Sequence, residues 1–138
     1  MSQRRYAEDT KVPVGRTQLQ LKERLQKAGA DQVAVFESAQ GGAVAFRLGG
    51  SMYRLTVPAN PRAKDPAQDL RRSWRLLFIL TTAKLEAIRD GGTTPEREFL
   101  ADMLLYDGQT VSDWVAPQLE QARVEGRMPN QLLLEGPK

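Results

Sequence analysis

The sequence predicts an α+β domain, in which an antiparallel meander of about three strands packs against a long amphipathic helix, with further N- and C-terminal helices. Two patterns indicate this fold. Between residues 33 and 57, apolar and polar side chains alternate with a period of two in three short runs, which is typical of half-buried strands. Between residues 66 and 89, apolar side chains recur every three or four positions, which is typical of a helix with one buried face. The length of 138 residues, with 41% hydrophobic side chains, fits a single domain.

The chain divides into a central domain and two terminal segments. Residues 1–12 are polar and have no regular period, so they are expected to form a flexible arm or a strap over the fold. The domain is expected to span residues 13–126. Residues 127–138 form a C-terminal tail.

A first helix is predicted to start with a cap at Thr17 and to end at Ala28. Thr17 and Gln20 have the spacing of a capping box, in which each side chain satisfies a backbone N–H of the first turn. Leu21 and Leu25 lie on one stripe of this helix, which is therefore expected to face the core.

Three strands are predicted at residues 33–37, 43–48 and 52–57. The segments between them contain glycine pairs and have lengths suited to hairpin turns. Because alternate side chains of a strand point to the same face, the inward face is expected to carry Val33, Val35, Val44, Phe46, Leu48, Tyr53, Leu55 and Val57. The outer face is expected to mix apolar and cationic groups, namely Phe36, Ala43, Ala45, Arg47, Met52, Arg54 and Thr56.

A long central helix is predicted from Pro66 to about Arg89, after a proline-rich loop. Asp65 is suited to the N-cap, Pro66 to the first helical position, and Gln68 to closing a capping box. The positions on its core-facing stripe are Leu70, Trp74, Leu77, Phe78, Thr81, Leu85 and Ile88. This helix is expected to form the centre of the core.

Two more helices are predicted toward the C-terminus. The first spans residues 95–106, and the side chains it is expected to bury are Phe99, Leu100, Met103 and Leu104. The second starts near residue 110 or 112 and ends at Glu125, and Pro117 is expected to kink it or to separate its first turn. Trp74 and Trp114 both lie on apolar helical stripes, which favours positions in the core.

The composition excludes several kinds of active site. The chain has no cysteine and no histidine, so disulfides, zinc fingers, iron–sulfur clusters and Ser-His or Cys-His catalytic pairs are excluded. No phosphate-binding loop and no Ser-x-x-Lys motif occurs. The acidic residues Glu98, Asp102, Asp107 and Asp113 are expected to be solvated side chains and not magnesium ligands. The chain is therefore expected to have no enzymatic activity, no metal and no cofactor.

The charge is asymmetric along the chain. Residues 1–75 contain 14 Lys or Arg and 7 Asp or Glu, a net charge of +7, whereas residues 76–138 contain 6 and 10, a net charge of −4. Seven cations lie between residues 47 and 75, namely Arg47, Arg54, Arg62, Lys64, Arg71, Arg72 and Arg75. They would form one basic patch if the sheet and the start of the central helix are adjacent.

A basic sheet face that also carries Phe36, Met52 and Tyr6 is suited to single-stranded nucleic acid, because cations contact phosphates and aromatic faces stack on bases. The competing interpretation is that the strand arginines are ordinary solvent-facing residues and that a helix covers Phe36. In that interpretation, the arginines at residues 71–75 form only the polar face of the central helix. Exposed aromatic side chains on the basic side would favour nucleic-acid binding.

Four segments carry a family resemblance. They are Tyr6–Val14, residues 74–75 with 83–87, Glu98–Ala101, and Asp107–Val111 with Trp114. With these segments the chain resembles small proteins encoded in bacteriophages and prophages, generally without an assigned activity. The resemblance implies a phage setting, where small basic proteins often handle DNA or block a host enzyme. It implies no catalytic residues.

The predicted function is sequence-independent binding of single-stranded DNA or RNA through the Arg-rich sheet face. The alternative is a protein-binding inhibitor or adaptor, such as an anti-defence protein that acts on a host nucleic-acid enzyme. Because a three-stranded sheet has open edges and an open face, a homodimer is also predicted. No segment reaches the roughly 20 apolar residues of a membrane-spanning helix, so a cytoplasmic protein without membrane contact is expected.

Overall fold

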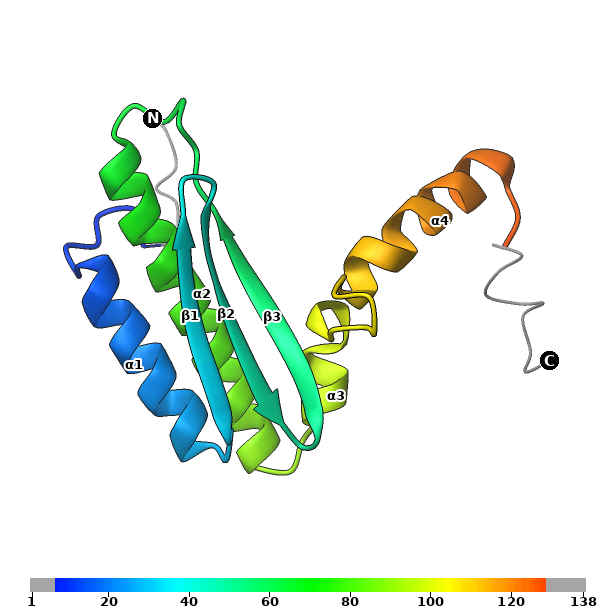
Figure 1. Cartoon of the computed structure of the whole chain (residues 1–138), viewed down its shortest axis with the longest axis horizontal. Helices are drawn as coiled ribbons and strands as arrows, with labels where there is room; N and C mark the ends of the chain where they lie inside the picture. Colours follow the sequence, from blue (N-terminus) through cyan, green and yellow to red (C-terminus); the bar gives the residue numbers. More distant parts are fainter. Residues whose placement is uncertain (1–6, 129–138) are drawn as a thin grey trace.

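Three antiparallel strands form one sheet in the order β1-β2-β3, within an α+β fold that confirms the predicted class (Figure 1). The computed structural model describes residues 7–128. The strands span Gln32–Ser38 (β1), Gly41–Leu48 (β2) and Ser51–Pro58 (β3). The first hairpin turn is shorter than predicted, because β2 already begins at Gly41, which pairs with Ser38.

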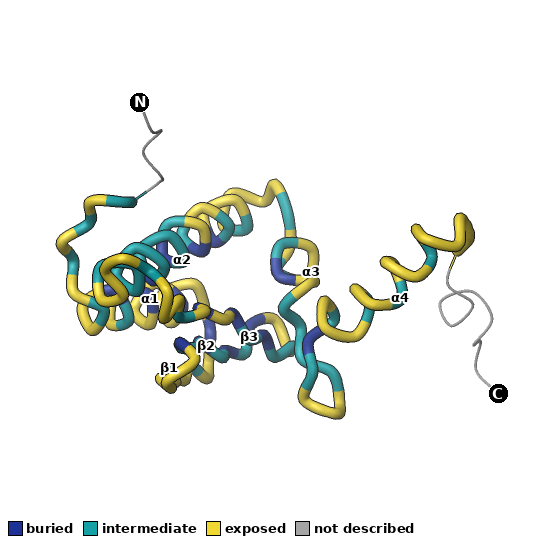
Figure 2. Tube along the Cα trace, turned by 90° about the horizontal axis from the view of Figure 1, so that it is seen from above, coloured by how far each residue is buried: buried dark blue, intermediate teal, exposed yellow. Residues whose placement is uncertain are grey.

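Two helices, α1 (Val14–Lys27) and α2 (Pro66–Arg89), lie side by side and run in the same direction over one face of the sheet (Figures 1 and 2). The predicted inward face is confirmed. Val44, Phe46, Leu48, Tyr53, Leu55 and Val57 are buried, and Val33 and Val35 are partly buried against them. Among the described residues, no helix covers the other face (Figure 2).

The core is built around aromatic rings. Phe46, Tyr53 and Phe99 form a cluster with ring centroids 5.3–5.6 Å apart. Trp74 of α2 is 1% exposed, as its core prediction requires. Trp74 lies against Gly42 near the start of β2, so it packs α2 onto this end of the sheet.

The start of α1 differs from the prediction. The helix begins at Val14 after Pro13, which makes no side-chain cap hydrogen bond. Thr17 is therefore inside the helix, where it is fully buried and has a hydroxyl without a hydrogen-bond partner among the described residues. The capping box is wrong because Thr17 faces the core.

The start of α2 is confirmed, with one change at Gln68. The side chain of Asp65 accepts a hydrogen bond from the Gln68 backbone N–H at 3.1 Å. The Gln68 side chain does not close a capping box, because it donates to the backbone oxygens of Glu8 and Thr10 at 3.1 and 2.7 Å. The described part of the N-terminal arm is thus held over the start of α2 as a strap.

The predicted helix over residues 95–106 is wrong beyond its first turn. The segment instead forms a single-turn helix, α3 (Pro95–Glu98), and a short 3₁₀ turn, η1 (Leu100–Asp102). Met103 then pairs with Tyr53, and the Leu104 N–H donates to the Met52 carbonyl at 2.8 Å. Pairing with the edge of β3 thus holds residues 103–104 in an extended conformation, although their sequence has helical periodicity. Of the four predicted core residues in this segment, Phe99 is buried and Leu100 is exposed.

The last helix, α4 (Val111–Glu125), runs through Pro117 as one helix and extends away from the body of the molecule (Figures 1 and 2). Thr110 caps it through a capping box with Asp113. No residue of α4 is buried. The core prediction for Trp114 is therefore wrong, because this side chain is 39% exposed.

Candidate nucleic-acid interface

The structure distributes the predicted site residues over separate surfaces. Phe36, Arg47, Met52 and Arg54 lie on the uncovered face of the sheet, because they alternate with the buried residues of their strands. Arg71, Arg72 and Arg75 lie on α2, which covers the opposite face. Arg62 and Lys64 lie in the loop between β3 and α2. Tyr6 lies outside the described residues.

The side chains in the middle of the uncovered sheet face are mostly small and apolar. Phe36 is 55% exposed and pairs with Ala43 on β2. Ala45 follows in the next row, where it pairs with Ala34 and Arg54. Phe36 is therefore an accessible aromatic ring next to small side chains.

Both arginines of this face have polar partners within the molecule. The Arg47 guanidinium donates to both carboxylate oxygens of Asp31, with Nε at 2.9 and 3.1 Å. Arg54 donates to the Gly108 carbonyl oxygen at 3.0 Å and lies 3.8 Å from the Asp113 carboxylate. Each cation has a nearby carboxylate, so this face has little net positive charge with which to attract phosphates.

The Asp31–Arg47 pair predicts a pH effect on stability. Hydrogen bonding to Arg47 lowers the pKa of Asp31 from its usual 3.8 in the folded protein. The contribution of the pair to the free energy of unfolding is thus present above pH 3.8 and is lost as the pH falls through the lower folded-state pKa. We expect the stability difference between the wild type and Asp31→Asn, measured by urea denaturation, to shrink as the pH falls below 3.8. A difference that stays constant would contradict the assignment.

Arg72 and Lys64 are surrounded by acidic groups. They line a shallow pocket whose other charged members are Glu8, Asp9, Asp65 and Asp69. Arg72 lies 3.8 Å from the Asp69 carboxylate, and both side chains are largely buried. These two cations therefore lie among four acidic side chains and are poorly placed for a phosphate.

A second set of cations follows the groove where α1 and α2 lie side by side. We name this groove the α1–α2 seam and define it by its six cations, Lys11, Arg24, Lys27, Arg71, Arg75 and Arg89. At its N-terminal end, Lys11 and Arg71 line a pocket between the two helix starts. At its middle, Arg75 donates to the Gln20 Oε1 at 2.6 Å and lies 4.5 Å above the centre of the Phe78 ring.

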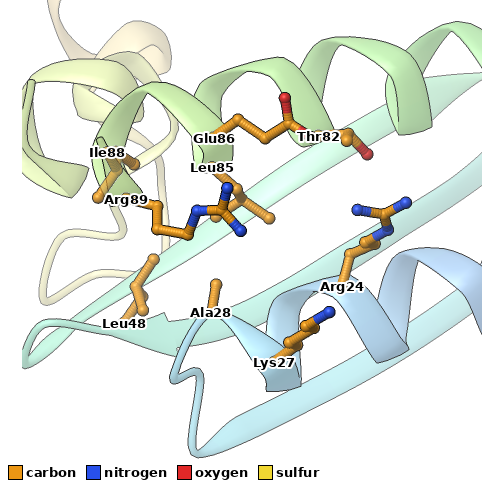
Figure 3. Close-up of a pocket in the computed structure, with 9 residues that line it drawn as sticks. All are labelled: Arg24, Lys27, Ala28, Leu48, Thr82, Leu85, Glu86, Ile88 and Arg89. Atoms are coloured by element: carbon orange, nitrogen blue, oxygen red, sulfur yellow. The ribbon is translucent and has the colours of Figure 1, made fainter. Parts of the chain in front are cut away.

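The C-terminal end of the seam is a pocket of about 240 Å³ (Figure 3). Arg24 and Lys27 reach it from α1, and Arg89 reaches it from α2. Ala28, Leu48, Leu85 and Ile88 form its apolar wall. Thr82 also lines the pocket, and its buried hydroxyl has no hydrogen-bond partner among the described residues.

The seam keeps its positive charge. Glu86 is the single carboxylate among the described residues that line the two pockets. Within residues 7–128, the structure shows no carboxylate partner for Lys11, Arg24, Lys27, Arg71 or Arg75. Arg89 is 3.9 Å from Asp90, at the exposed end of α2. Five cations thus line the two pockets together with one acid, so this surface is electropositive.

Sequence reasoning found only Arg71 and Arg75 of this seam. Lys11, Arg24, Lys27 and Arg89 were missed because they lie far from the cationic segment at residues 47–75. These four cations lie near Arg71 and Arg75 only because α1 and α2 run parallel with their ends together. Helical spacing alone puts Arg24 and Lys27 on one side of α1, and this was the available signal.

The acidic residues of the C-terminal half are spread over several local interactions. Glu98 accepts a hydrogen bond from the Thr93 hydroxyl at 3.0 Å, and Asp113 belongs to the cap of α4. Burial raises the pKa of Asp102, and the charge of Lys84 opposes this rise. Among the described residues, no cluster of acidic side chains could hold a metal ion.

Comparisons with protein families, with curated proteins and with solved structures found no match. No helix in the described part of the chain is long and apolar enough to cross a membrane. The functional argument therefore depends on the geometry of the surfaces.

Proposed function

We propose that this chain binds single-stranded DNA or RNA through phosphate contacts along the α1–α2 seam. The observation that carries the proposal is the row of six seam cations, with Glu86 as the single carboxylate among the described residues that line its pockets and Asp90 beside Arg89 at its end. Cations in such a row neutralise successive phosphates and release condensed counterions, which is the main source of sequence-independent affinity. The proposal moves the contact surface from the sheet face to the helical layer.

The shape of the seam favours a single strand. Packed helices have axes about 8–10 Å apart, so the groove between them is narrow compared with a duplex, which would touch it with one backbone only. The exposed ring of Phe36 lies on the opposite face of the sheet, because it alternates with Val35, which packs against the core. Affinity therefore comes from charge more than from base stacking, and little preference for base sequence is expected.

The experiment is a fluorescence-anisotropy titration of a labelled single strand of about 30 nucleotides at several salt concentrations. The seam variant carries Arg24→Gln, Lys27→Gln, Arg71→Gln and Arg89→Gln. Each lost contact to a single strand reduces the slope of log affinity against log salt by about 0.7. We therefore expect the slope of the seam variant to be less steep by about 3, and its affinity at low salt to fall strongly.

The matched control removes the same charge elsewhere. Its substitutions are Lys22→Gln, Arg97→Gln, Arg123→Gln and Arg127→Gln, all at exposed positions outside the seam. A third variant, with Arg47→Gln and Arg54→Gln, tests the sheet face. Equal losses in the seam variant and the matched control would show an effect of net charge alone and would overturn the seam. A wild type that does not bind at low salt would overturn nucleic-acid binding altogether.

A protein-binding role is the second candidate, and a specific observation favours it. Six of the nine exposed large hydrophobic side chains of the described residues lie between residues 100 and 128, namely Leu100, Tyr106, Trp114, Leu119, Val124 and Met128. This part of the chain is acidic, so its aromatic side chains are not on the basic side. The resemblance to phage proteins is compatible with either role, and the phage setting and a cytoplasmic location remain part of the proposal.

A further inference from the structure

One side chain of α2 joins the N-terminal strap, residues 7–13, to a cation of the seam. The Gln68 Nε2 donates to the carbonyl oxygens of Glu8 and Thr10 at 3.1 and 2.7 Å. The Gln68 Oε1 accepts a hydrogen bond from the Arg71 Nε at 2.9 Å. Carbonyl oxygens only accept and a guanidinium only donates, so the partners fix the orientation of this amide. Both of its ends are engaged at once.

The two bonds to the strap determine its register along α2. They hold carbonyl groups two residues apart, so the strap cannot slide without losing both of them. Inside the strap, the Thr10 N–H donates to the Ala7 carbonyl oxygen at 3.2 Å, and the Val12 N–H donates to the Thr10 Oγ1 at 3.3 Å. The strap is therefore a short folded segment that Gln68 fixes in one position.

Gln68 lies between two pockets of opposite composition and lines both of them. On one side, Glu8 and Asp9 of the strap lie in the acidic pocket at the start of α2. On the other side, Lys11 and Arg71 line the pocket at the N-terminal end of the seam, where no described lining residue is acidic. The strap thus carries two acids and one cation within residues 8–11, and its register decides which of these charges reaches the seam.

We propose that Gln68 is a positioning residue for nucleic-acid binding. It fixes the strap so that Lys11 joins Arg71 in the α1–α2 seam, while Glu8 and Asp9 stay in the neighbouring pocket. A strap displaced by two residues would bring Asp9 to the position of Lys11 and would replace a cation with an acid. This inference rests on the proposed function of the seam and adds to it how the strap completes the binding surface.

The fold does not depend on the Gln68 side chain. The α2 N-cap uses the backbone N–H of Gln68, which donates to the Asp65 carboxylate at 3.1 Å and is present in any substitution except proline. The start of α1 is held separately, because Val14 packs against the core. Substitutions of Gln68 are therefore expected to release the strap and to leave both helices in place.

Gln68→Met is the test variant, because methionine has a similar length, carries no charge and cannot donate to the strap. Its first measurement is amide hydrogen exchange of residues 8–12 without nucleic acid. We expect these amides to exchange about tenfold faster or more than in the wild type, because two hydrogen bonds to the strap are lost. Circular dichroism checks that the helices are retained.

Gln20→Met is the matched control. The Gln20 Oε1 accepts a hydrogen bond from Arg75 at 2.6 Å, so this variant also removes a glutamine partner from a seam arginine. Among the described residues, Gln20 has no hydrogen bond to the strap. Exchange of residues 8–12 is expected to be the same in Gln20→Met as in the wild type.

The second measurement is the effect of Lys11→Gln in each of the three backgrounds. It uses fluorescence anisotropy of a labelled single strand of about 30 nucleotides at several salt concentrations. In the wild type and in Gln20→Met, the loss of one cation should make the salt slope less steep by about 0.7. In Gln68→Met, Lys11→Gln should change the slope no further, because Lys11 is no longer held in the seam. A general loss of stability would not remove the effect of one particular lysine.

The outcomes separate this inference from the proposed function. Equal exchange of the strap amides in the wild type and in Gln68→Met would overturn the inference and leave binding by the seam intact. A full effect of Lys11→Gln in the Gln68→Met background would also overturn it, because Lys11 would then reach the strand without Gln68. No effect of Lys11→Gln in the wild type would have the same meaning. A wild type that does not bind the strand at low salt would overturn the proposed function and, with it, the role of Gln68.

Discussion

Replacing Trp74 with alanine is expected to lower the free energy of unfolding by about 3–5 kcal/mol, the usual cost of removing a large buried aromatic side chain. Trp74 is 1% exposed and lies in the first half of α2. Its ring lies against the backbone of β2, since a Cβ built on Gly42 would be 2.5 Å from Trp74 Cζ2. The indole thus fills a notch that only glycine leaves open, and its removal creates a cavity between helix and sheet.

The measurement is urea denaturation followed by circular dichroism, with Phe36→Ala as the matched aromatic control. Phe36 is on the uncovered sheet face, so its loss is expected to cost less than about 1 kcal/mol. Total stabilities of domains are about 5–15 kcal/mol, so Trp74→Ala will leave a small margin. Comparable costs for the two variants would contradict the assignment of Trp74 to the core.

The stability test also bears on the nucleic-acid proposal. Trp74 holds α2 in place, and α2 carries Arg71, Arg75 and Arg89 of the seam. If Trp74→Ala loses nucleic-acid binding, the loss follows from a displaced or unfolded α2. Substitutions of the exposed seam cations are needed to separate charge from fold.

The two tryptophans show what a periodic pattern can and cannot predict. Trp74 and Trp114 occupy equivalent positions on apolar helical stripes, and the same reasoning placed both in the core. The pattern identifies which side of a helix is apolar, but not whether another element of the chain covers that side. For α2 the sheet provides the cover, and for α4 the described chain provides none.

The same limit applies to the segment after Phe99. Its apolar spacing predicted a helix through Leu104, whereas the edge of β3 pairs with Met103 and Leu104. β3 lies about 50 residues earlier in the chain, and helical periodicity holds no information about such a distant backbone partner. Strand alternation was more reliable, because both the buried and the open face of the meander follow from a local period of two.

The candidate site depends on how α1 packs against α2, which the sequence pattern does not predict. The cations from Arg47 to Arg75 are close in sequence, but the sheet separates Arg47 and Arg54 from the arginines of α2. The cations that do gather around the seam come from residues 11, 24–27, 71–75 and 89. Their proximity is set by the parallel packing of α1 and α2, which no local pattern specified.

The largest effect of a small substitution is expected at Gly41, where alanine should cost about 3 kcal/mol or more. Gly41 begins β2 with a φ of +128°, a conformation that side-chain-bearing residues rarely adopt. A Cβ at this position would overlap the Val57 carbonyl oxygen and would lie 2.7 Å from the backbone nitrogen of Ala59. Strain of this kind costs about 1–3 kcal/mol, and the overlap with neighbouring backbone adds a similar amount.

Gly50 provides the matched control in the second hairpin of the same sheet. It also has a positive φ, +87°, but a Cβ there would meet nothing within 4 Å. Gly50→Ala is therefore expected to cost only the conformational strain, about 1–2 kcal/mol. The glycine pairs at residues 41–42 and 49–50 look alike in the sequence, where both were assigned to turns. If Gly41→Ala and Gly50→Ala prove equally costly in urea denaturation, the close backbone approach at Gly41 is wrong. If they differ as expected, the difference combines the steric contact at Gly41 with the greater strain of its φ of +128° compared with +87° at Gly50.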